Sequence, residues 1–208
     1  MKKTIAVLMT AAVLSCSMVI SAGAESSISG ASYTNSFDSM EDLNGWEAYF
    51  LPNPDTAGPA SVKEDLSKHW TIENGKLKRI NDFKNGSSTT NAAILTFTEM
   101  KFQYFELTVK YQKVEGNWPW AVVAFGTSMP GKYFTHQGCG VFVQDEGKVT
   151  IWGTTPFDGP NESAANSGYV AKGEHTMKLR VTKDNVEVTI DDKWTQSKKY
   201  SNIPEGYI

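Results

Sequence analysis

Apolar and polar residues alternate along several short stretches of this chain, most clearly at residues 103–112. In that stretch the apolar residues Phe105, Leu107, Val109 and Tyr111 alternate with the polar residues Glu106, Thr108, Lys110 and Gln112. Because successive side chains of a strand point to opposite faces, this period of two puts the apolar residues on one face. A strand with one buried and one solvated face is typical of an antiparallel sandwich. We therefore expect Phe105, Leu107 and Val109 to be buried between two sheets.

Other short stretches also read as strands, and turn signals separate them. They lie at residues 46–51, 76–80, 92–97, 120–126, 139–144, 148–152, 175–182 and 186–191. The turn signals are Asn74-Gly75, Asn85-Gly86, Glu146-Gly147 and Asp184-Asn185. No stretch after residue 24 has a convincing helical period. This pattern predicts an all-β fold, a two-sheet antiparallel jelly-roll sandwich.

The first 24 residues have the organisation of a secretory signal peptide. A basic start at Lys2-Lys3 precedes an apolar stretch at residues 5–14, and Ala22-Gly23-Ala24 supplies a small-residue cleavage site. We expect cleavage after Ala24 and export as a free, secreted bacterial protein. A lipoprotein anchored through Cys16 is the alternative. The apolar run continues past that cysteine through Met18-Val19-Ile20, which fits a lipoprotein poorly.

The rest of the chain is expected to form one domain. Residues 25–32 are rich in serine and glycine and are expected to be a flexible spacer, followed by a single β-sandwich domain at residues 33–208. Gly206-Tyr207-Ile208 looks like the beginning of a strand. The natural chain therefore either stops there or continues, in which case the domain is truncated at its C-terminus.

Composition narrows the classes of partner. The formal net charge is -3, and it becomes -5 when Lys2-Lys3 is removed with the leader. The chain has no basic stripe and only two arginines, Arg79 and Arg180, so nucleic acid is not expected as a partner. No segment after the leader is long and apolar enough to span a membrane. Cys139 is the one cysteine outside the leader, and we expect a buried, inert thiol there.

The order of several short motifs resembles a known family. These are Phe37-Asp38, Trp46, Trp70-Thr71-Ile72-Glu73-Asn74-Gly75-Lys76-Leu77, Phe105-Glu106-Leu107, the strand at residues 138–143, Gly173-Glu174-His175 with Leu179, and Gly206-Tyr207-Ile208. In this order the chain resembles the concanavalin A/laminin G-like jelly rolls of bacterial secreted proteins. It looks most similar to 3-keto-disaccharide hydrolase-like domains and to fructan-type carbohydrate-binding modules. The resemblance implies two curved antiparallel sheets, with a glycan or a calcium ion at the concave face or rim.

One departure from relatives of this fold bears on catalysis. Laminarinase-type hydrolases carry Glu-x-Asp-x-x-Glu on a central strand, which places their catalytic carboxylates on one face. This chain has no such run, because Glu106 is followed on its own face by Thr108 and Lys110. We therefore expect a noncatalytic protein, with a glycoside-active enzyme of the same fold as the alternative.

Aromatic residues in turn-rich segments are the main candidates for ligand binding. Trp118 and Trp120 flank Pro119, and their rings face the same way in an extended chain. Tyr133 and His136 lie in the loop at residues 129–137, and Trp152 ends a strand. The alternative for these rings is packing against the rim of the sandwich. Trp46 and Trp70, by contrast, are expected to be core or edge residues.

Polar candidates are fewer. Arg79 and Asn81 follow a strand and are candidates for binding sugar hydroxyls, with a solvated sheet face as the alternative for Arg79 and for Arg180. Asp145-Glu146 and Asp191-Asp192 have oxygen ligands that suit calcium, although turn positions are the simpler explanation. No other cofactor is expected.

Together, these features indicate a secreted, noncatalytic domain that binds a poly- or oligosaccharide through rim aromatics. A structural or adhesive surface domain is the third class that remains open.

Overall fold

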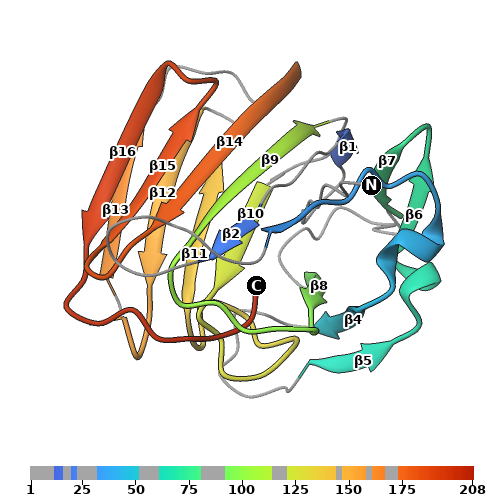
Figure 1. The fold of residues 1–208 in the computed structure, drawn as a ribbon, viewed down its shortest axis with the longest axis horizontal. Coiled ribbons are helices and arrows are strands. Elements are labelled where there is room, and N and C mark those ends of the chain that lie inside the picture. Colours follow the sequence, from blue (N-terminus) through green and yellow to red (C-terminus); the bar gives the residue numbers. More distant parts are fainter. Residues whose placement is uncertain are drawn as a thin grey trace, which may run out of the picture.

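The fold of the computed structural model consists of antiparallel β-strands (Figure 1). It describes residues 12–15, 20–22, 32–51, 61–80, 92–113, 121–143, 147–157, 161–166 and 173–208. Within these ranges the helical elements are two short 3-10 helices, η1 (Met40–Leu43) and η2 (Leu66–Lys68). No helix in the described ranges has the length and apolar character needed to cross a membrane. The prediction of an all-β fold is confirmed.

Three sheets make up the described part of the chain. The largest has the order β16 (Trp194–Lys199), β15 (Asn185–Ile190), β14 (Gly173–Val181), β9 (Phe105–Lys113), β1 (Ala12–Ser15), β7 (Lys76–Arg79) and β6 (Trp70–Glu73), with β2 (Ile20–Ala22) and β3 (Ser32–Tyr33) beside β9. The second has the order β10 (Ala121–Phe125), β11 (Cys139–Val143), β12 (Lys148–Gly153) and β13 (Asn161–Asn166). The third has the order β5 (Val62–Glu64), β4 (Trp46–Leu51) and β8 (Ala92–Phe97). Figure 1 shows β9 and β14–β16 as one layer in front of β10–β13, which is the arrangement of a sandwich.

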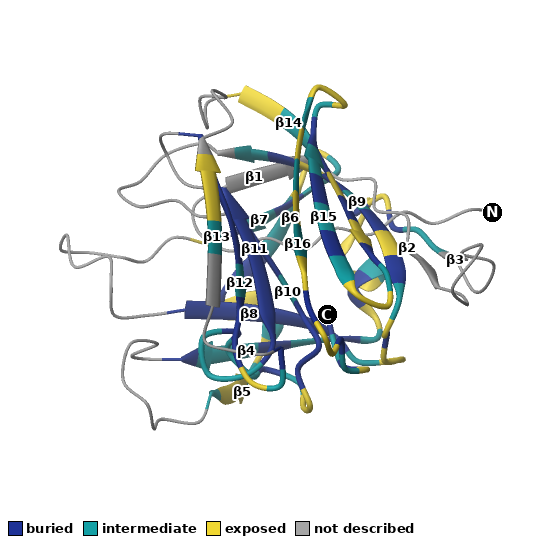
Figure 2. Ribbon diagram, turned by 90° about the vertical axis from the view of Figure 1, so that its left-hand side faces the viewer, coloured by how far each residue is buried: buried dark blue, intermediate teal, exposed yellow. Residues whose placement is uncertain are grey.

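The main core lies between these layers. Phe105, Leu107 and Val109 of β9 are at most 1% exposed, as their alternation predicted. Facing strands contribute alternate residues in the same way, such as Val141 from β11 and Ile151 from β12. Figure 2 shows β8 and β11 as buried along their whole length. The two layers therefore share one continuous hydrophobic core.

Three further core predictions are also confirmed. Trp46 and Trp70 are 6% and 1% exposed, and both belong to the main core. Cys139 is fully buried there, with its Sγ 3.9 Å from the Tyr200 hydroxyl. Burial raises the pKa of the Cys139 thiol to about 12. Such a thiol is neutral and shielded from solvent at neutral pH, in agreement with the buried, inert thiol predicted from the sequence.

The turn chemistry agrees with the sequence at Asn74-Gly75. The two residues join β6 to β7 with φ angles of 55° and 68°. Two successive positive φ angles are the signature of a type I′ turn, which Asn-Gly adopts readily. The Asn74-Gly75 turn thus fixes which residues of β6 and β7 pair with each other.

Side chains tie the open edges of the sandwich together. β16 is at one edge of the large sheet and β13 is at one edge of the second. The Gln196 side chain amide of β16 donates to the Ser163 backbone carbonyl of β13 and to the Ser163 hydroxyl, both at 2.9 Å. The edges of two different sheets are therefore linked by a side chain.

Residues of the predicted leader belong to the large sheet. β1 pairs with both β9 and β7, and β2 pairs with both β9 and β3. Cleavage after Ala24, which stays a prediction, would remove both strands. The predicted spacer lies mostly outside the described residues, except for Ser32, which begins β3.

Candidate functional site

A second hydrophobic cluster lies on the opposite face of the second sheet from the main core. Because strand residues alternate, Val122, Phe142 and Trp152 point away from the main core while their neighbours in sequence point into it. Ile94 of β8 and Leu51 of β4 join the same cluster. We call this side of β4, β8 and β10–β13 the outer face. It carries apolar and aromatic side chains where a solvated sheet would carry polar ones.

The loop at residues 129–138 adds aromatic rings to the outer face. Phe134 is 1% exposed and lies directly over Gly140 of β11, where an added Cβ would come within 2.4 Å of its ring. The Thr154 hydroxyl anchors the loop by donating to the Phe134 carbonyl at 2.8 Å. The Tyr133 ring lies 4.8 Å from the Phe134 ring and packs against the second cluster, as Trp152 does. The His136 ring lies 6.0 Å from that of Tyr133, edge to face.

The structure thus brings together three of the residues that were predicted from the sequence to bind a ligand. Tyr133 and Trp152 are half-buried on the same hydrophobic cluster, although they belong to different segments. His136 is held against Tyr133 by the ring contact and by a loop turn, in which the His136 N–H donates to the Tyr133 carbonyl at 2.9 Å. This arrangement suits a flat ligand that has an apolar face and polar groups at its edge.

Two buried polar atoms lie on the outer face. The Oγ1 of Thr150 and the Nε1 of Trp152 are buried atoms without a hydrogen-bond partner among the described residues. Both side chains point to the outer face, because they lie two residues apart on β12. Thr150 itself is 0% exposed. Since buried polar groups are nearly always hydrogen-bonded, these atoms mark a place where a ligand can supply the missing partner.

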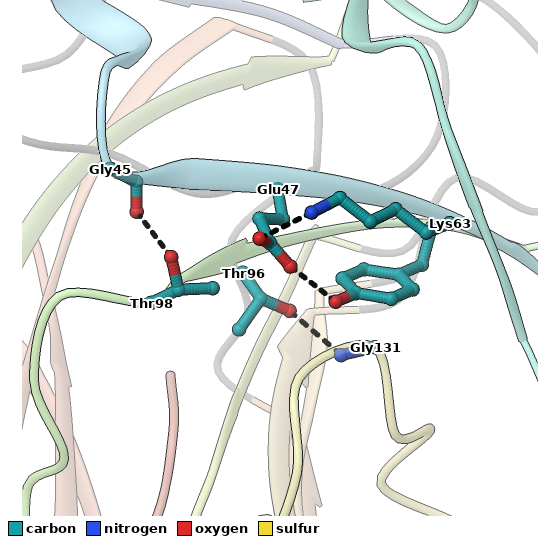
Figure 3. Close-up of polar contacts among 7 residues, drawn as sticks. Gly45, Glu47, Lys63, Thr96, Thr98 and Gly131 are labelled. Atoms are coloured by element: carbon teal, nitrogen blue, oxygen red, sulfur yellow. Dashed lines mark hydrogen bonds and ion pairs between the residues drawn. The ribbon is translucent and has the colours of Figure 1, made fainter.

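A polar corner adjoins this face on β4 and β5. Lys63 donates to Glu47 Oε1, and the Tyr49 hydroxyl donates to Glu47 Oε2 (Figure 3). The strand register puts Tyr49 directly opposite Lys63. The hydrogen bonds from Lys63 and Tyr49 lower the pKa of the Glu47 carboxyl, and burial, together with the Glu47 carboxylate, raises the pKa of Tyr49. Glu47 is therefore ionised and Tyr49 neutral at physiological pH.

The polar corner is joined to the aromatic loop through Gly131. An added Cβ at Gly131 would lie 2.3 Å from the Tyr49 ring. The Gly131 N–H donates to the Thr96 hydroxyl at 3.2 Å (Figure 3). The Gly131 carbonyl accepts from the Ser61 hydroxyl at 2.6 Å. Tyr49 also packs on the second cluster. The corner and the aromatic loop therefore form one continuous surface.

The polar corner was not predicted from the sequence. The alternation along residues 46–51 does predict that Glu47, Tyr49 and Leu51 share one face of a strand. The pairing of β4 with β5 could not be predicted, because β5 is short and its residues Val62 and Lys63 are exposed. Without that pairing, nothing in the sequence brings Lys63 to Glu47.

The remaining residues predicted to bind a ligand either lie outside the described residues or lie elsewhere in the fold. Trp118, Trp120 and Asn81 lie outside the described residues, so their assignment stays a prediction. Arg79 is 4% exposed on β7 of the large sheet, opposite Trp70 in register. The alternative of a solvated face for Arg79 is therefore wrong, and a role in binding sugar hydroxyls stays a prediction. Arg180 does face solvent, and its Nε lies 3.2 Å from Glu106 Oε1 across the β14–β9 pair.

The calcium candidates gain no support. Asp191 uses both carboxylate oxygens within the protein, with Oδ1 accepting from the Thr176 N–H at 2.7 Å and Oδ2 lying 2.8 Å from His175 Nδ1. Asp192 bonds Lys178 at 2.6 Å. Asp145 and Glu146 lie outside the described residues. Within the described ranges, no group of three or more histidine, cysteine or acidic side chains is placed to hold a metal ion.

Comparison with known proteins supports the fold. A solved structure described under the heading "Prominent members of the human gut microbiota express endo-acting O-glycanases to initiate mucin breakdown" matches with a TM-score of 0.50 and 16% sequence identity. The match covers 79% of this chain and 69% of the other. No known family profile matches the sequence. No curated protein matches it either. At this identity the likeness establishes a shared β-rich fold.

Proposed function

We propose that the protein is a secreted, noncatalytic carbohydrate-binding domain that takes a poly- or oligosaccharide on the outer face. The observation that carries this proposal is the pairing of half-buried rings, Tyr133 and Trp152, with Thr150 Oγ1 and Trp152 Nε1, which have no hydrogen-bond partner among the described residues. Ligand sites are typically apolar and aromatic surfaces with a few well-placed polar groups. A sugar ring matches both features, because its C–H face stacks on an aromatic ring while its hydroxyls donate and accept hydrogen bonds.

The polar corner extends this surface. A saccharide that stacks on Tyr133 and Trp152 can direct further hydroxyls toward Glu47 and Lys63 at the end of the same face. Charge-assisted hydrogen bonds of this kind are stronger than those between neutral groups. Trp118 and Trp120 are proposed as a second stacking platform on the strength of their spacing alone. Export through the leader would place the protein where glycans are abundant.

A glycoside-active enzyme is the second candidate. The solved structure that matches is described under a heading that names endo-acting O-glycanases, which favours some form of action on glycans. Against it, the chain lacks the Glu-x-Asp-x-x-Glu run, and the Glu47 carboxylate is already held by Lys63 and Tyr49. Release of reducing sugar from the glycan that the protein binds would make the enzyme the better description.

The first experiment is a glycan array with the chain that begins at Glu25, followed by calorimetric titration of the glycan found. Trp152→Ala is expected to weaken binding by about 30-fold, corresponding to about 2 kcal/mol, because aromatic anchors carry a large share of binding energy. Trp152→Phe keeps a stacking ring but removes Nε1, so it is expected to lose a smaller part of the affinity. Trp120→Ala tests the second platform in the same assay.

The matched control is Trp194→Ala, which removes a partly buried tryptophan that packs against the main core from β16. It is expected to retain binding. Circular dichroism of every variant checks that the sandwich is intact. Wild-type affinity in Trp152→Ala would show that its ring only covers the sheet, and the proposed site would be wrong.

A further inference from the structure

Two donors hold the Glu47 carboxylate of the polar corner, one from its own strand and one from β5. The Tyr49 hydroxyl donates to Oε2 and Lys63 donates to Oε1 (Figure 3). The Tyr49 ring packs on the second cluster, and an added Cβ at Gly131 would lie 2.3 Å from it, so the ring has little room to move. Thr96, directly opposite Glu47 in register, accepts from the Gly131 N–H at 3.2 Å. The carboxylate therefore has a fixed orientation relative to the aromatic loop.

The pair formed by Glu47 and Lys63 keeps hydrogen-bonding capacity toward solvent. Each oxygen of a carboxylate has two lone pairs, and a lysine ammonium has three N–H groups. The contacts described for the corner use one lone pair on each oxygen and one N–H. The side chains of Glu47 and Lys63 are 29% and 60% exposed, so a ligand reaches both in the fold as it stands. The corner thus offers an acceptor and a donor side by side.

A vicinal diol has the complementary arrangement of groups. One of its hydroxyls donates to the Glu47 carboxylate, while the neighbouring hydroxyl accepts from the Lys63 ammonium. Both hydrogen bonds are charge-assisted and therefore stronger than those between neutral groups. A single hydroxyl would use only one of the two partners. The corner consequently distinguishes two adjacent hydroxyls from one.

A sugar ring on the aromatic loop can present such a diol to the corner. Tyr133 lies two residues along the loop from Gly131, which contacts the Tyr49 ring. Tyr49 and Tyr133 both pack against the second cluster. When the C–H face of a sugar stacks on an aromatic ring, its hydroxyls project from the edge of the sugar ring. The stacking surface and the polar corner are therefore placed to contact different parts of one sugar.

The charges of the corner favour a neutral sugar. Glu47 and Lys63 are of opposite sign and directly paired. An acidic sugar would bring a carboxylate against Glu47, and an amino sugar would bring an ammonium against Lys63. Like charges placed together at a binding surface are unfavourable and select against the wrong partner. Neutral hydroxyls meet neither repulsion.

We propose that the polar corner recognises an unsubstituted vicinal diol of a neutral sugar, with Glu47 as the acceptor and Lys63 as the donor. Tyr49 is a positioning residue, because its hydroxyl acts on the sugar only through Glu47. This inference rests on the proposed function, since it names the saccharide chemistry that the outer face selects.

The test compares deoxy sugars in NMR titrations of the full chain. The probes are the methyl glycosides of glucose, galactose and mannose, each also in its 3-deoxy and 6-deoxy forms. Both deoxy forms lack one hydroxyl, but only loss of the 3-hydroxyl removes every vicinal diol from the ring. At least one parent glycoside is expected to bind, and its 6-deoxy form is expected to bind with similar affinity. The 3-deoxy form is expected to bind at least about tenfold more weakly, because it loses a hydrogen bond to a charged group.

Variants of the corner assign this preference to its residues. Glu47→Gln and Lys63→Met are each expected to weaken binding of the parent glycoside about tenfold and to bring it close to that of the 3-deoxy form. Tyr49→Phe keeps the packed ring and removes the hydroxyl. It is expected to reduce the ratio of parent to 3-deoxy affinity without changing the affinity of the 3-deoxy form, which a purely structural role would not do.

The matched control is Lys178→Met, which removes the lysine of an exposed ion pair with Asp192 at the large sheet. Binding of all the glycosides is expected to be unchanged in this variant. Circular dichroism checks that each variant keeps the sandwich.

The outcomes separate this inference from the proposed function. Equal affinity for the parent and 3-deoxy glycosides would overturn the diol inference, and so would the absence of binding by all three parents. A preference for acidic or amino sugars on the glycan array would also overturn it. In each case a glycan whose binding depends on Trp152 would leave the proposed function standing. An array on which no glycan binds would instead overturn the proposed function, and this inference with it.

Discussion

At the scale of single residues, burial and hydrogen bonding decide what each polar group can do. The pair Asp191 and Asp192 illustrates this, because two adjacent acids in one turn have different surroundings. Asp191 is held by the Thr176 N–H and by His175, whereas the Asp192 side chain is 66% exposed and bonds only Lys178 among the contacts described. The sequence predicted a turn here and could not distinguish the two acids, since their partners lie on β14.

Asp191 is expected to stabilise the fold in a pH-dependent way. Burial alone would raise the pKa of its carboxyl, but the hydrogen bonds from Thr176 and His175 outweigh it and hold the pKa below the usual value. A carboxylate with a lowered folded-state pKa stabilises the protein above about pH 4, and this contribution is lost as pH falls through the folded-state pKa. Asp191→Asn should therefore cost about 1–3 kcal/mol of unfolding free energy at pH 7 and much less at pH 3.

Urea denaturation at the two pH values measures this difference. Asp192→Asn is the matched control, because it lies in the same turn with a similar positive φ angle and forms only an exposed ion pair. Its cost is expected to stay below about 1 kcal/mol. An equal cost of Asp191→Asn at pH 3 and pH 7 would mean that the ionised form is not the stabilising one.

The Cys139 thiol is expected to be unreactive in the folded protein. Its burial and its pKa of about 12 leave very little thiolate at pH 8. In the Cys16→Ser chain, Ellman's reagent should therefore react on the timescale of unfolding and rapidly in urea. A fast reaction without denaturant would contradict the buried position.

At the scale of elements, apolar and alternating stretches predicted most strands, whereas three strands with few apolar residues were missed, each at the edge of a sheet. The stretches at residues 46–51 and 92–97 match β4 and β8 to the residue. β13 and β16, with the sequences Asn-Glu-Ser-Ala-Ala-Asn and Trp-Thr-Gln-Ser-Lys-Lys, were missed. Edge strands bury less of their surface, so they carry little apolar periodicity. β5 was not predicted for the same reason, and Lys63 was therefore not predicted to belong to the candidate site.

β9 gives the clearest test of the alternation. Leu107→Ala is expected to lower the unfolding free energy by about 2–5 kcal/mol, through lost burial and the cavity left in the main core. Thr108→Ala, one residue along on the other face, is the control and should cost less than about 1 kcal/mol. Chemical denaturation of both variants provides the comparison, and a cost below about half a kcal/mol for Leu107→Ala would mean that the core face was misassigned.

At the scale of the whole molecule, the sequence predicted one sandwich but not how distant segments meet. Tyr133 and Trp152 were nominated separately, and only the fold places them on one hydrophobic cluster. The position of residues 12–15 and 20–22 inside the large sheet was not anticipated, because leader patterns and strand patterns are both apolar. Whether these residues are removed as a leader or remain as strands in the exported protein depends on cleavage after Ala24.

Cleavage of the leader after Ala24 is therefore the prediction to test for the whole molecule. The exported protein is expected to begin at Glu25, since Ala22-Gly23-Ala24 is the small-residue cleavage site. Intact-mass and N-terminal peptide analysis of the secreted protein measures it, with the full-length precursor as the reference. A lipid-modified peptide starting at Cys16 would instead establish the lipoprotein alternative.

The link between Gln196 of β16 and Ser163 of β13 bears on how the protein behaves in storage. Unlinked edge strands are templates on which other chains can pair, and they are common starting points for fibrils. A glutamine that bonds the neighbouring edge keeps the two margins together and makes it harder for either to separate and recruit another molecule. Gln196→Ala should therefore shorten the lag time of thermally induced aggregation more than it lowers the melting temperature, as light scattering and calorimetry on the same samples would reveal.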